Sequence, residues 1–446
     1  MEGVSALERI LFSPLGDSDP VRNCYDGACL HIVRHYQPTQ VVLFYTAEME
    51  RKERRDHRYT RALKRLAPQC EVREIFSGIE TPQQFDAFQG VLPEAVGALA
   101  DAHPAAQILL NLSSGTPQMK TVMALLSVDF PNCVGVQVDT PVRGSNRSAF
   151  AAQDDEDVEA LLENNFDEEP DAANRCHEPA LRVFRYYAER SRILSLAETY
   201  EYPAALRLAR SCPELPRAAR QLLEHAAARS ALQAEKAKKA LSRYDGKELF
   251  PVEGAAGELL EYFLLMQMDE RCGRLSNMMV RVIPFLYSYL LAYERKNLKS
   301  QLRSLCERKK QGYRLTRASL AAADAGFLAY LDQKFWPEYR EGDLSFLLLY
   351  YHGEYLKGNS TIRDAALHAQ VMAEVEQVAC ARELRNSAAH EMVNVTRASF
   401  VEAVGMEPAA LLNHFWQMLL LLCGPRIRNL RGIYDDLNRN LARELR

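Results

Sequence analysis

The sequence predicts a multidomain protein, with an N-terminal α/β Rossmann-like domain followed by all-α middle and C-terminal domains. Its 446 residues suffice for about three domains. In the first third of the chain, short β-branched runs alternate with helical patterns, which is typical of a parallel sheet with crossover helices. After His177 the strand signal disappears, and Ala, Leu, Arg and Glu recur at helical spacing.

The α/β domain is expected to span residues 1–170. Its expected strands are residues 9–13, 41–46, 71–76, 107–113 and 133–140. Its expected helices are residues 26–36, 47–66, 82–102 and 117–130. A strongly acidic stretch, residues 154–171, marks the end of the domain.

Two helical domains are expected after the acidic stretch, a middle one at 171–250 and a C-terminal one at 251–446. A break rich in Gly and Pro, residues 244–257, separates them. The middle domain has helical patterns at residues 181–200, 204–209 and 217–244. The C-terminal domain has them at residues 258–269, 277–299, 317–334, 362–391, 396–404 and 408–423.

Composition excludes several classes of protein. The 55 Lys and Arg against 59 Asp and Glu, a formal net charge of -4, argue against a general nucleic-acid coater. The 48% hydrophobic residues exclude a largely disordered chain. The ten cysteines form no Cys-x-x-Cys pair, which predicts reduced thiols in a cytoplasm and no structural metal. No export signal or membrane anchor is expected, since residues 416–423 are too short an apolar run to span a bilayer.

Two loops are candidates for ligand binding, because ligands of open parallel sheets bind beyond the carboxyl ends of the strands. If the strand order is three-two-one-four-five, the loop Ser13-Pro-Leu-Gly-Asp-Ser-Asp-Pro20 neighbours the loop Ser113-Ser-Gly-Thr-Pro117. The second loop offers hydroxyls, a proline at the first helical turn and a cation at Lys120, which suit phosphate or ribose. Neither loop has a dinucleotide or Walker fingerprint, and a simple capped turn is the alternative.

The first loop carries two acidic residues, Asp17 and Asp19, with Arg22 close by in the sequence. Carboxylates repel phosphates. We therefore expect them to cap the following helix or to accept hydrogen bonds from ribose or base groups.

A possible RNA-cleaving group lies in the C-terminal domain, where Arg385, Asn386 and His390 fall within one and a half helical turns. RNA cleavage without a metal needs a proton-transfer group of near-neutral pKa and a fixed cation for the developing negative charge. His390 suits the first role and Arg385 the second, while Asn386 shares a helical face with His390. Arg385 lies about 140° around the helix from His390, so one straight helix does not bring the two groups together, whereas a second copy of the helix across a two-fold axis would.

Other Arg/His pairs compete with this one: Arg220 with His225, Arg363 with His368, and Arg51 with His57. Residues 385–390 are preferred because Ala388 and Ala389 allow two helices to approach closely. For any such pair, a solvated face or a satisfied hydrogen bond is the simpler interpretation.

Together these motifs resemble the Csm-type accessory ribonucleases of type III CRISPR systems. The resemblance rests on the loop after the first strand, the helix start Asp26-Gly-Ala-Cys-Leu-His31, the run Asn111-Leu-Ser-Ser-Gly-Thr-Pro-Gln-Met-Lys120 and the segment Arg385-Asn-Ser-Ala-Ala-His390. Those proteins join an N-terminal CARF domain to a C-terminal HEPN domain. The resemblance implies a cytoplasmic homodimer that binds cyclic tetra- or hexaadenylate and then cleaves single-stranded RNA without a metal cofactor. It implies no membrane association and no stable complex with the CRISPR effector.

The resemblance also implies roles for single residues. Arg385, Asn386 and His390 are expected to cleave RNA, leaving a 2',3'-cyclic phosphate or 3'-phosphate and a 5'-hydroxyl. The activator site is expected to comprise Ser13, Gly16, Asp17, Asp19, Asn111, Ser113, Ser114, Gly115, Thr116, Pro117 and Lys120. Thr116 is the candidate for slow cleavage of the activator within the CARF domain.

Two other functions stay open at this point. A CARF-type sensor that regulates DNA without nuclease activity requires a basic recognition helix near the C-terminus. The tail, residues 426–446, is rich in Arg but interrupted by acidic residues, and a solvated helix is the favoured interpretation of it. A nucleotide-binding domain with a purely structural helical extension leaves residues 385–390 unexplained.

Overall fold

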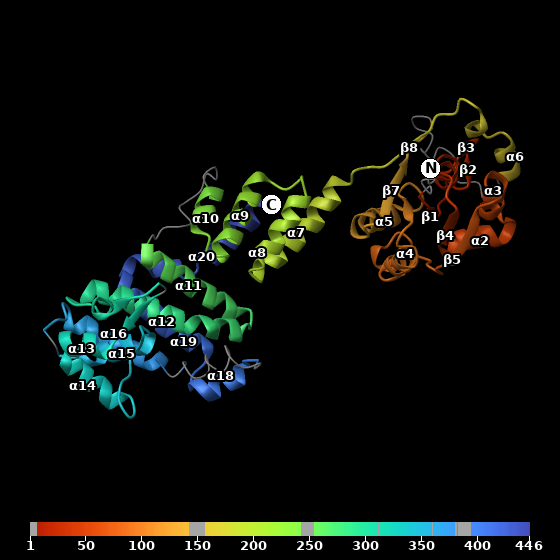
Figure 1. The fold of residues 1–446 in the computed structure, drawn as a ribbon. Helices are drawn as coiled ribbons and strands as arrows, with labels where there is room; N and C mark the ends of the chain where they lie inside the picture. Colours follow the sequence, from red (N-terminus) through yellow and green to blue (C-terminus); the bar gives the residue numbers. More distant parts are fainter. Residues whose placement is uncertain are drawn as a thin grey trace, which may run out of the picture. The chain divides into compact units, whose positions relative to one another are not determined.

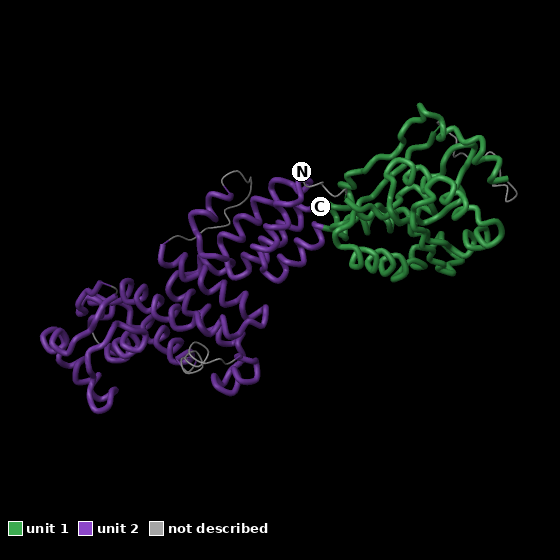
Figure 2. The backbone as a smooth tube through the Cα atoms, turned by 45° about the vertical axis from the view of Figure 1, so that its right-hand side comes forward, with its two compact units in different colours: residues 1–188 green, residues 189–446 purple. Residues whose placement is uncertain are grey.

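The computed structural model describes residues 7–141, 157–241, 254–310, 312–358, 360–379, 381 and 394–446. The chain divides into two compact units, residues 1–188 and residues 189–446 (Figure 2). The RNA-cleaving candidates Arg385, Asn386 and His390 lie outside the described residues.

Unit 1 is built on a six-stranded sheet in the order β5-β4-β1-β6-β7-β8. The strands are β1 (Arg9–Pro14), β4 (Gln40–Tyr45), β5 (Glu71–Phe76), β6 (Gln107–Asn111), β7 (Cys133–Val138) and β8 (Cys176–His177). The first five are parallel, follow the order three-two-one-four-five, and agree with the predicted strands to within two residues at each end. β8 pairs antiparallel with β7.

Helices cover both faces of this sheet (Figure 1). The helices of unit 1 are α1 (Ala28–Tyr36), α2 (Ala47–Asp56), α3 (Arg58–Leu66), α4 (Val91–Ala102), α5 (Pro117–Asp129) and α6 (Val158–Glu163), with a 3-10 turn at Phe85–Phe88. Because side chains alternate along a strand, Ile10 and Phe12 pack with α4 and α5, whereas Leu11 packs with α1 and α3. One helix was expected over residues 47–66, but it breaks at His57, whose φ is 54°.

Several features of unit 1 were not expected, among them α6 within the acidic stretch and the start of α4 at Val91 rather than near residue 82. A short hairpin, β2 (Val21–Arg22) with β3 (Tyr25–Asp26), follows β1. The acidic stretch is not simply solvated, because Asn165 and Asp167 are buried and β8 comes after them. The sheet of unit 1 therefore extends past residue 170.

Unit 2 is mainly helical. After α7 (Arg182–Glu198), which crosses the unit boundary, come α8 (Tyr202–Ser211), α9 (Arg217–Ser230), α10 (Ala234–Leu241), α11 (Gly254–Arg271), α12 (Leu275–Asn297), α13 (Arg317–Ala323), α14 (Ala325–Lys334), α15 (Phe346–Tyr355), α16 (Ala365–Ala379), α18 (Arg397–Val404), α19 (Pro408–Cys423) and α20 (Ile433–Glu444). α11, α12, α16 and α19 pack together, and α20 returns to pack on α9.

The sequence predictions for unit 2 need four corrections. A three-stranded sheet, β9 (Glu307–Arg308), β10 (Tyr313–Leu315) and β11 (Gly342–Asp343), interrupts the region expected to be all-α. The helices expected at 217–244 and 317–334 are each two helices. α15 was not expected. The tail helix α20 is amphipathic rather than merely solvated, with Leu437 and Leu441 buried.

α12 is also long and apolar enough to cross a membrane by length and composition alone. It contacts α11, α15 and α19, and its buried side chains include Met278, Phe285 and Tyr289. Such burial explains its apolar composition within unit 2.

Candidate functional site

The loops after β1 and β6 are in direct contact at the carboxyl edge of the sheet. β1 and β6 are neighbouring parallel strands, so their following loops leave the sheet side by side. A β-carbon added to Gly16 would meet the backbone nitrogen of Gly115 at 2.7 Å. Gly115 itself has a φ of +83°, a conformation that favours glycine. Both glycines predicted for the site are therefore required by the backbone.

Asn111 joins the two loops through its side chain. Its amide donates hydrogen bonds to the hydroxyls of Ser13 and Ser114, both at 2.9 Å. Its side-chain oxygen accepts the backbone N–H of Ser113 at 2.8 Å. Ser13, Asn111 and Ser114 are fully buried. These three predicted site residues therefore stabilise the conformation of the loops and are not exposed on their surface.

Asp19 fixes the first loop to α1. Its two carboxylate oxygens accept the backbone N–H groups of Gly16 and Cys29, each at 3.1 Å. Only 4% of Asp19 is exposed, and burial raises the pKa of its carboxyl group even though the hydrogen bond to Ser114 lowers it. Asp19 thus bonds an N–H in the first turn of α1 from outside the helix, whose N-cap residue is Gly27, and its contact with a ligand stays a prediction.

The remaining predicted residues reach the surface of the loops. Ser113 lies at the end of β6, and its hydroxyl accepts the N–H of Val138 at 2.8 Å. Thr116 caps α5 and donates its hydroxyl proton to the carbonyl of Pro82 at 2.7 Å. Pro117 occupies the first turn of α5, as expected. Burial lowers the pKa of the half-buried Lys120, although the charge of Asp19 opposes this.

Asp17 differs from Asp19. Its side chain is 54% exposed and forms an ion pair with Lys52 on α2 at 2.9 Å. The cation that balances Asp17 is thus Lys52 and not Arg22, the nearest cation in the sequence.

A recess beside the loops contains residues that were not predicted for the site. Ser113 lines it together with Arg22, Tyr25, Asp139 and Arg175. Arg175 was missed because it lies far along the chain, behind an acidic stretch that was taken as the end of the domain. The recess adds two arginines and a tyrosine to a site whose other residues supply hydroxyls, backbone groups, carboxylates and the ammonium of Lys120.

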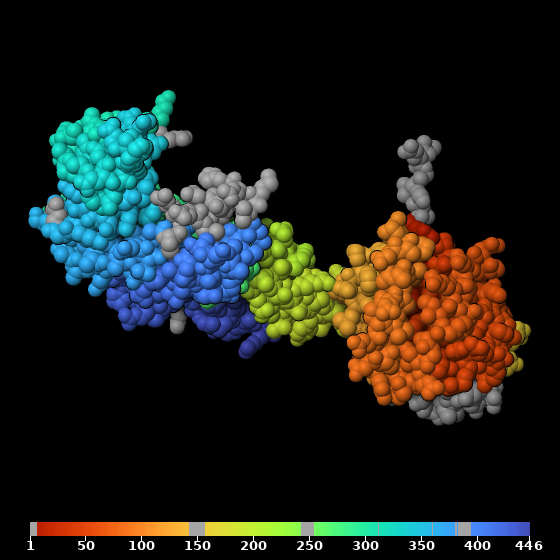
Figure 3. All heavy atoms as spheres, turned by 90° about the horizontal axis from the view of Figure 1, so that it is seen from below, coloured from red at the N-terminus to blue at the C-terminus, as the bar shows by residue number. Residues whose placement is uncertain are grey.

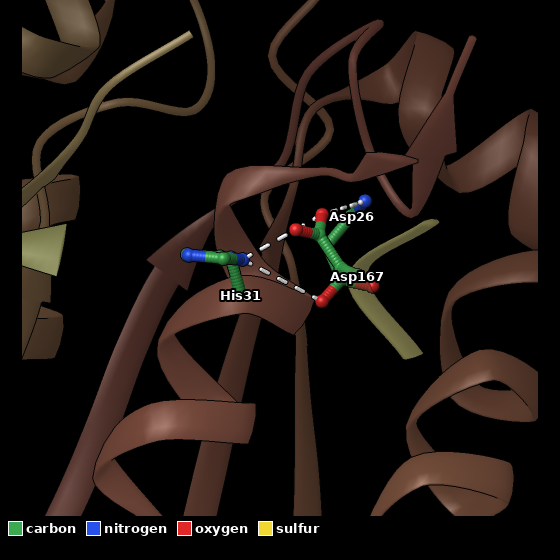
Figure 4. A group of neighbouring side chains, drawn as sticks. All are labelled: Asp26, His31 and Asp167. Atoms are coloured by element: carbon green, nitrogen blue, oxygen red, sulfur yellow. Dashed lines mark hydrogen bonds and ion pairs between the residues drawn. The ribbon is translucent and has the colours of Figure 1, made fainter. Parts of the chain in front are cut away.

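Behind the recess, Asp26, His31 and Asp167 converge (Figure 4). Nδ1 of His31 lies 3.6 Å from a carboxylate oxygen of Asp26 and 3.7 Å from one of Asp167. Arg34 donates to Asp26 at 2.7 Å, and Arg175 donates to Asp167 at 2.6 Å. Burial raises the pKa of Asp26, but hydrogen bonds from His31 and Arg34 outweigh it and lower the pKa to about 2.

This donor set resembles a metal site only in composition. The carboxylate oxygens that face His31 already accept from the two arginines, and a cation there would be repelled by both guanidinium groups. The arrangement is better explained as a buried ionic cluster. It fixes the hairpin to the segment that leaves unit 1, because Asp26 N–H also donates to Asp167 at 2.7 Å.

The competing Arg/His pairs have ordinary structural explanations. His368 is buried, bonded through Nδ1 to the hydroxyl of Tyr293 at 2.7 Å and through Nε2 to the carbonyl of Gly353 at 2.9 Å. His225 is buried and bonded to the carbonyl of Ala237 at 2.9 Å. His57 ends α2 with an exposed ring. Each pair that competes with residues 385–390 is thus a packing or surface feature.

Three family models match successive parts of the chain. The model of the Cas_Csm6 CARF domain matches residues 71–176, that of the CRISPR-associated protein Csm6 6H domain matches residues 179–230, and that of the Cas_Csm6 HEPN domain matches residues 249–442.

Individual relatives agree with the domain matches. The chain is 38% identical over 226 residues to the CRISPR system endoribonuclease Csm6 of Mycobacterium tuberculosis, which covers 50% of this chain and 54% of that protein. It is 37% identical over 210 residues to the protein of the same name from Enterococcus italicus, covering 46% and 48%. The chain thus spans about half the length of the curated relatives it matches.

The solved structure of Enterococcus italicus Csm6 bound to cyclic hexa-2'-fluoro-hexa-dAMP matches 98% of this chain and 100% of that one, with a TM-score of 0.60 and 25% identity. An α/β domain with paired loops at its carboxyl edge, followed by 6H and HEPN helices, defines a protein of the CARF-HEPN class. The chain carries the CARF, 6H and HEPN domains of Csm6 proteins, and the resemblance stated from the sequence is confirmed.

Proposed function

We propose that this chain is a cyclic-oligoadenylate-activated endoribonuclease that cleaves single-stranded RNA in type III CRISPR antiviral defence. One observation carries the proposal: two interlocked loops, Gly16 against Gly115, form the ligand edge of a CARF domain in a chain that continues into a HEPN domain. Because the Enterococcus italicus relative is described as bound to a cyclic hexaadenylate analogue, cyclic hexaadenylate is the first activator to test and cyclic tetraadenylate the second.

The activator site divides into two groups of residues. The partly exposed set, Gly16, Asp17, Ser113, Gly115, Thr116, Pro117 and Lys120, supplies the ligand contacts, with Arg22 and Arg175 in the adjoining recess. The buried set, Ser13, Asp19, Asn111 and Ser114, holds those contacts in place. A ring of sugar-phosphates needs many modest contacts from hydroxyls, amides and a few cations, which this arrangement supplies.

RNA cleavage is assigned to Arg385, Asn386 and His390, which lie outside the described residues. His390 moves protons between the ribose 2'-hydroxyl and the leaving oxygen, and Arg385 stabilises the charge on phosphorus. Asn386 orients the imidazole or the phosphate. These roles need no metal ion. A homodimer in the cytoplasm brings the two groups together from two copies of the chain.

Slow cleavage of the activator within the CARF domain is assigned to Thr116. Its hydroxyl caps α5 and donates to the carbonyl of Pro82, which holds Thr116 in place within the loop expected to face the activator. Thr116→Ala is expected to lose activator turnover by a clearly larger factor than it loses activator binding.

The test of the main proposal is cleavage of a fluorescent single-stranded RNA in EDTA. The reaction contains no activator or cyclic tri-, tetra- or hexaadenylate. Wild type, His390→Ala and His57→Ala are compared, since His57 is an exposed histidine in a competing Arg/His pair. Ring-dependent cleavage lost only in His390→Ala is the expected outcome. Absence of cleavage by wild type under every condition refutes the proposal.

A further inference from the structure

A lobe of unit 2 lies between α12 and α15 and contains β9, β10, β11, α13 and α14. We call residues 299–345 the inserted lobe. The start of the lobe lies beside the segment that follows α15, because Lys299 N–H donates to the carbonyl of Thr361 at 3.0 Å and Leu298 forms a β-bridge with Ile362. The inserted lobe forms the teal part of unit 2 in Figure 3.

The first notable feature of the inserted lobe is a basic hairpin formed by β9 and β10. The segment from 303 to 314 holds five cationic residues, Arg303, Arg308, Lys309, Lys310 and Arg314, against one acid, Glu307. Lys309 pairs with Asp343, and Arg314 with Glu341. Arg308 and Lys310 are exposed, and neither has an ion pair with a described residue. In a chain of net charge -4, this is a local concentration of positive charge.

The second feature is Trp336, whose side chain is 95% exposed. The backbone on either side of it is anchored. The ring of Phe335 lies 5.4 Å from that of Tyr339, and Tyr339 is buried with its hydroxyl bonded to the carbonyl of Leu315 at 3.0 Å. An indole held in water by a fixed backbone adds nothing to the stability of the lobe. A large exposed apolar side chain of this kind indicates an interaction site.

Cations and further aromatic rings lie close to Trp336 in the sequence and on the same lobe. Lys334 sits over the ring of Tyr330, 5.2 Å from its centre, and Arg340 is exposed with no ion pair among the described residues. Both neighbouring acids are paired elsewhere, Glu338 with Arg317 at 3.6 Å and Glu341 with Arg314. Exposed aromatic rings interleaved with cations are the features that bind single strands, because every base has a face that stacks.

We propose that the inserted lobe is a docking surface for single-stranded RNA, in which a base stacks on Trp336 while Arg308, Lys310 and Arg340 contact phosphates. This rests on the proposed function, because the RNA held here is substrate that extends beyond the position of cleavage. A long RNA that reaches both the lobe and the cleaving residues therefore binds more tightly than a short one. The cleavage step itself does not depend on the lobe.

The test measures KM and kcat of the activated full chain on an RNA of about 20 nucleotides and on one of about four. Trp336→Ala is expected to raise KM for the long RNA at least about fivefold, since stacking on one aromatic ring contributes that much or more. The double variant Arg308→Ser/Lys310→Ser is expected to raise it similarly and to reduce the salt dependence of binding by about 0.7 per lost phosphate contact. KM for the short RNA, and kcat for both, stay unchanged.

Matched controls exist in the chain. Tyr187→Ala removes an aromatic side chain that is 57% exposed, and Lys64→Ser/Arg73→Ser removes two exposed cations of unit 1. Neither control is expected to change KM for either RNA. An unchanged KM for the long RNA in both lobe variants overturns the proposal.

Two other outcomes also overturn it. An equal rise in KM for both RNAs would show that the substitutions act on the cleaving residues and not on a distant docking surface. A changed oligomeric state of Trp336→Ala would show that the lobe is a contact between copies of the chain. Direct binding of the long RNA to non-cleaving His390→Ala, followed by fluorescence anisotropy, tests the lobe even if wild type cleaves no RNA. Failure of the docking surface and failure of the proposed function are thus distinguishable.

Discussion

A β-carbon on Gly16 would lie 2.7 Å from the backbone nitrogen of Gly115, closer than real side chains approach. The contact exists because β1 and β6 are adjacent and parallel, so the loops that follow them share one edge of the sheet. The same contact makes the shape of one loop depend on the position of the other.

Gly16→Ala is therefore expected to push the two loops apart and to weaken activator binding. Forcing an extra carbon into a filled space costs about 1–3 kcal/mol, and a loss of binding free energy of that size lowers affinity about 5- to 150-fold. Calorimetric titration with cyclic hexaadenylate measures it. Gly432→Ala is the control, because its added carbon would meet only a carboxylate oxygen of Asp435 at 3.8 Å. Equal affinities of wild type and Gly16→Ala would contradict the expectation.

Asp17 and Asp19, two residues apart, are expected to respond differently to the same substitution. Asp19→Asn presents an amide N–H to the backbone N–H of Gly16 or Cys29, and an unsatisfied buried donor costs about 1–3 kcal/mol. Asp17→Asn removes only an exposed ion pair with Lys52, which is expected to change stability by less than about 1 kcal/mol. Urea unfolding of unit 1 compares them. Equal destabilisation by the two variants is the result that speaks against this assignment.

The sheet of unit 1 was predictable because its central strands are buried on both faces and therefore appear as continuous apolar runs. The helix breaks at His57 and Leu232 were not predictable. Both residues have a left-handed backbone conformation, although neither is glycine or proline. β8 is two residues long and forms only through pairing with β7, so no local hydrophobic pattern predicts it.

The candidate ligand loops were predictable from their place after the strands, but the division of labour within them was not. Nothing in the sequence separates Ser113, which reaches the recess, from Ser114, which is fully buried. Arg175 and Asp167 were missed because an acidic stretch usually lies in solvent, whereas here Asp167 pairs with Arg175 at 2.6 Å.

The buried His225 is expected to make unit 2 less stable in mild acid. Burial lowers the pKa of His225 to about 4, so the folded chain keeps it neutral while the unfolded chain, with a pKa near 6.5, takes up a proton. The contribution of neutral His225 to the free energy of unfolding is complete above pH 6.5. It is lost as the pH falls from 6.5 to 4, by about 3 kcal/mol in total. Hydrogen exchange of α9 amides across this range measures it in wild type and His225→Asn. The asparagine variant is expected to lack this part of the pH dependence, and identical pH profiles would disprove the assignment.

The last prediction concerns Arg229 and Glu261, a buried ion pair that joins α9 to α11. Arg229 is fully buried, donates to both carboxylate oxygens at 2.8 and 2.6 Å, and lies 5.1 Å from the ring centre of Tyr434 on α20. Arg229→Met leaves the carboxylate of Glu261 buried and unpaired, which costs about 3–5 kcal/mol of folding free energy. Glu261→Leu leaves the guanidinium of Arg229 buried and unpaired, at a similar cost. The double variant removes both charges and is expected to be destabilised by clearly less than the sum of the single variants.

A double-mutant cycle in urea measures this coupling, with the exposed pair Arg397 and Glu407, 2.8 Å apart, as the control. The exposed pair is expected to couple by less than about 1 kcal/mol, because water already solvates both partners. Additive losses at Arg229 and Glu261 would mean that each side chain acts through packing alone. Strong coupling would instead show that the contact between the 6H and HEPN helices depends on charge, so that the junction is specific as well as stable.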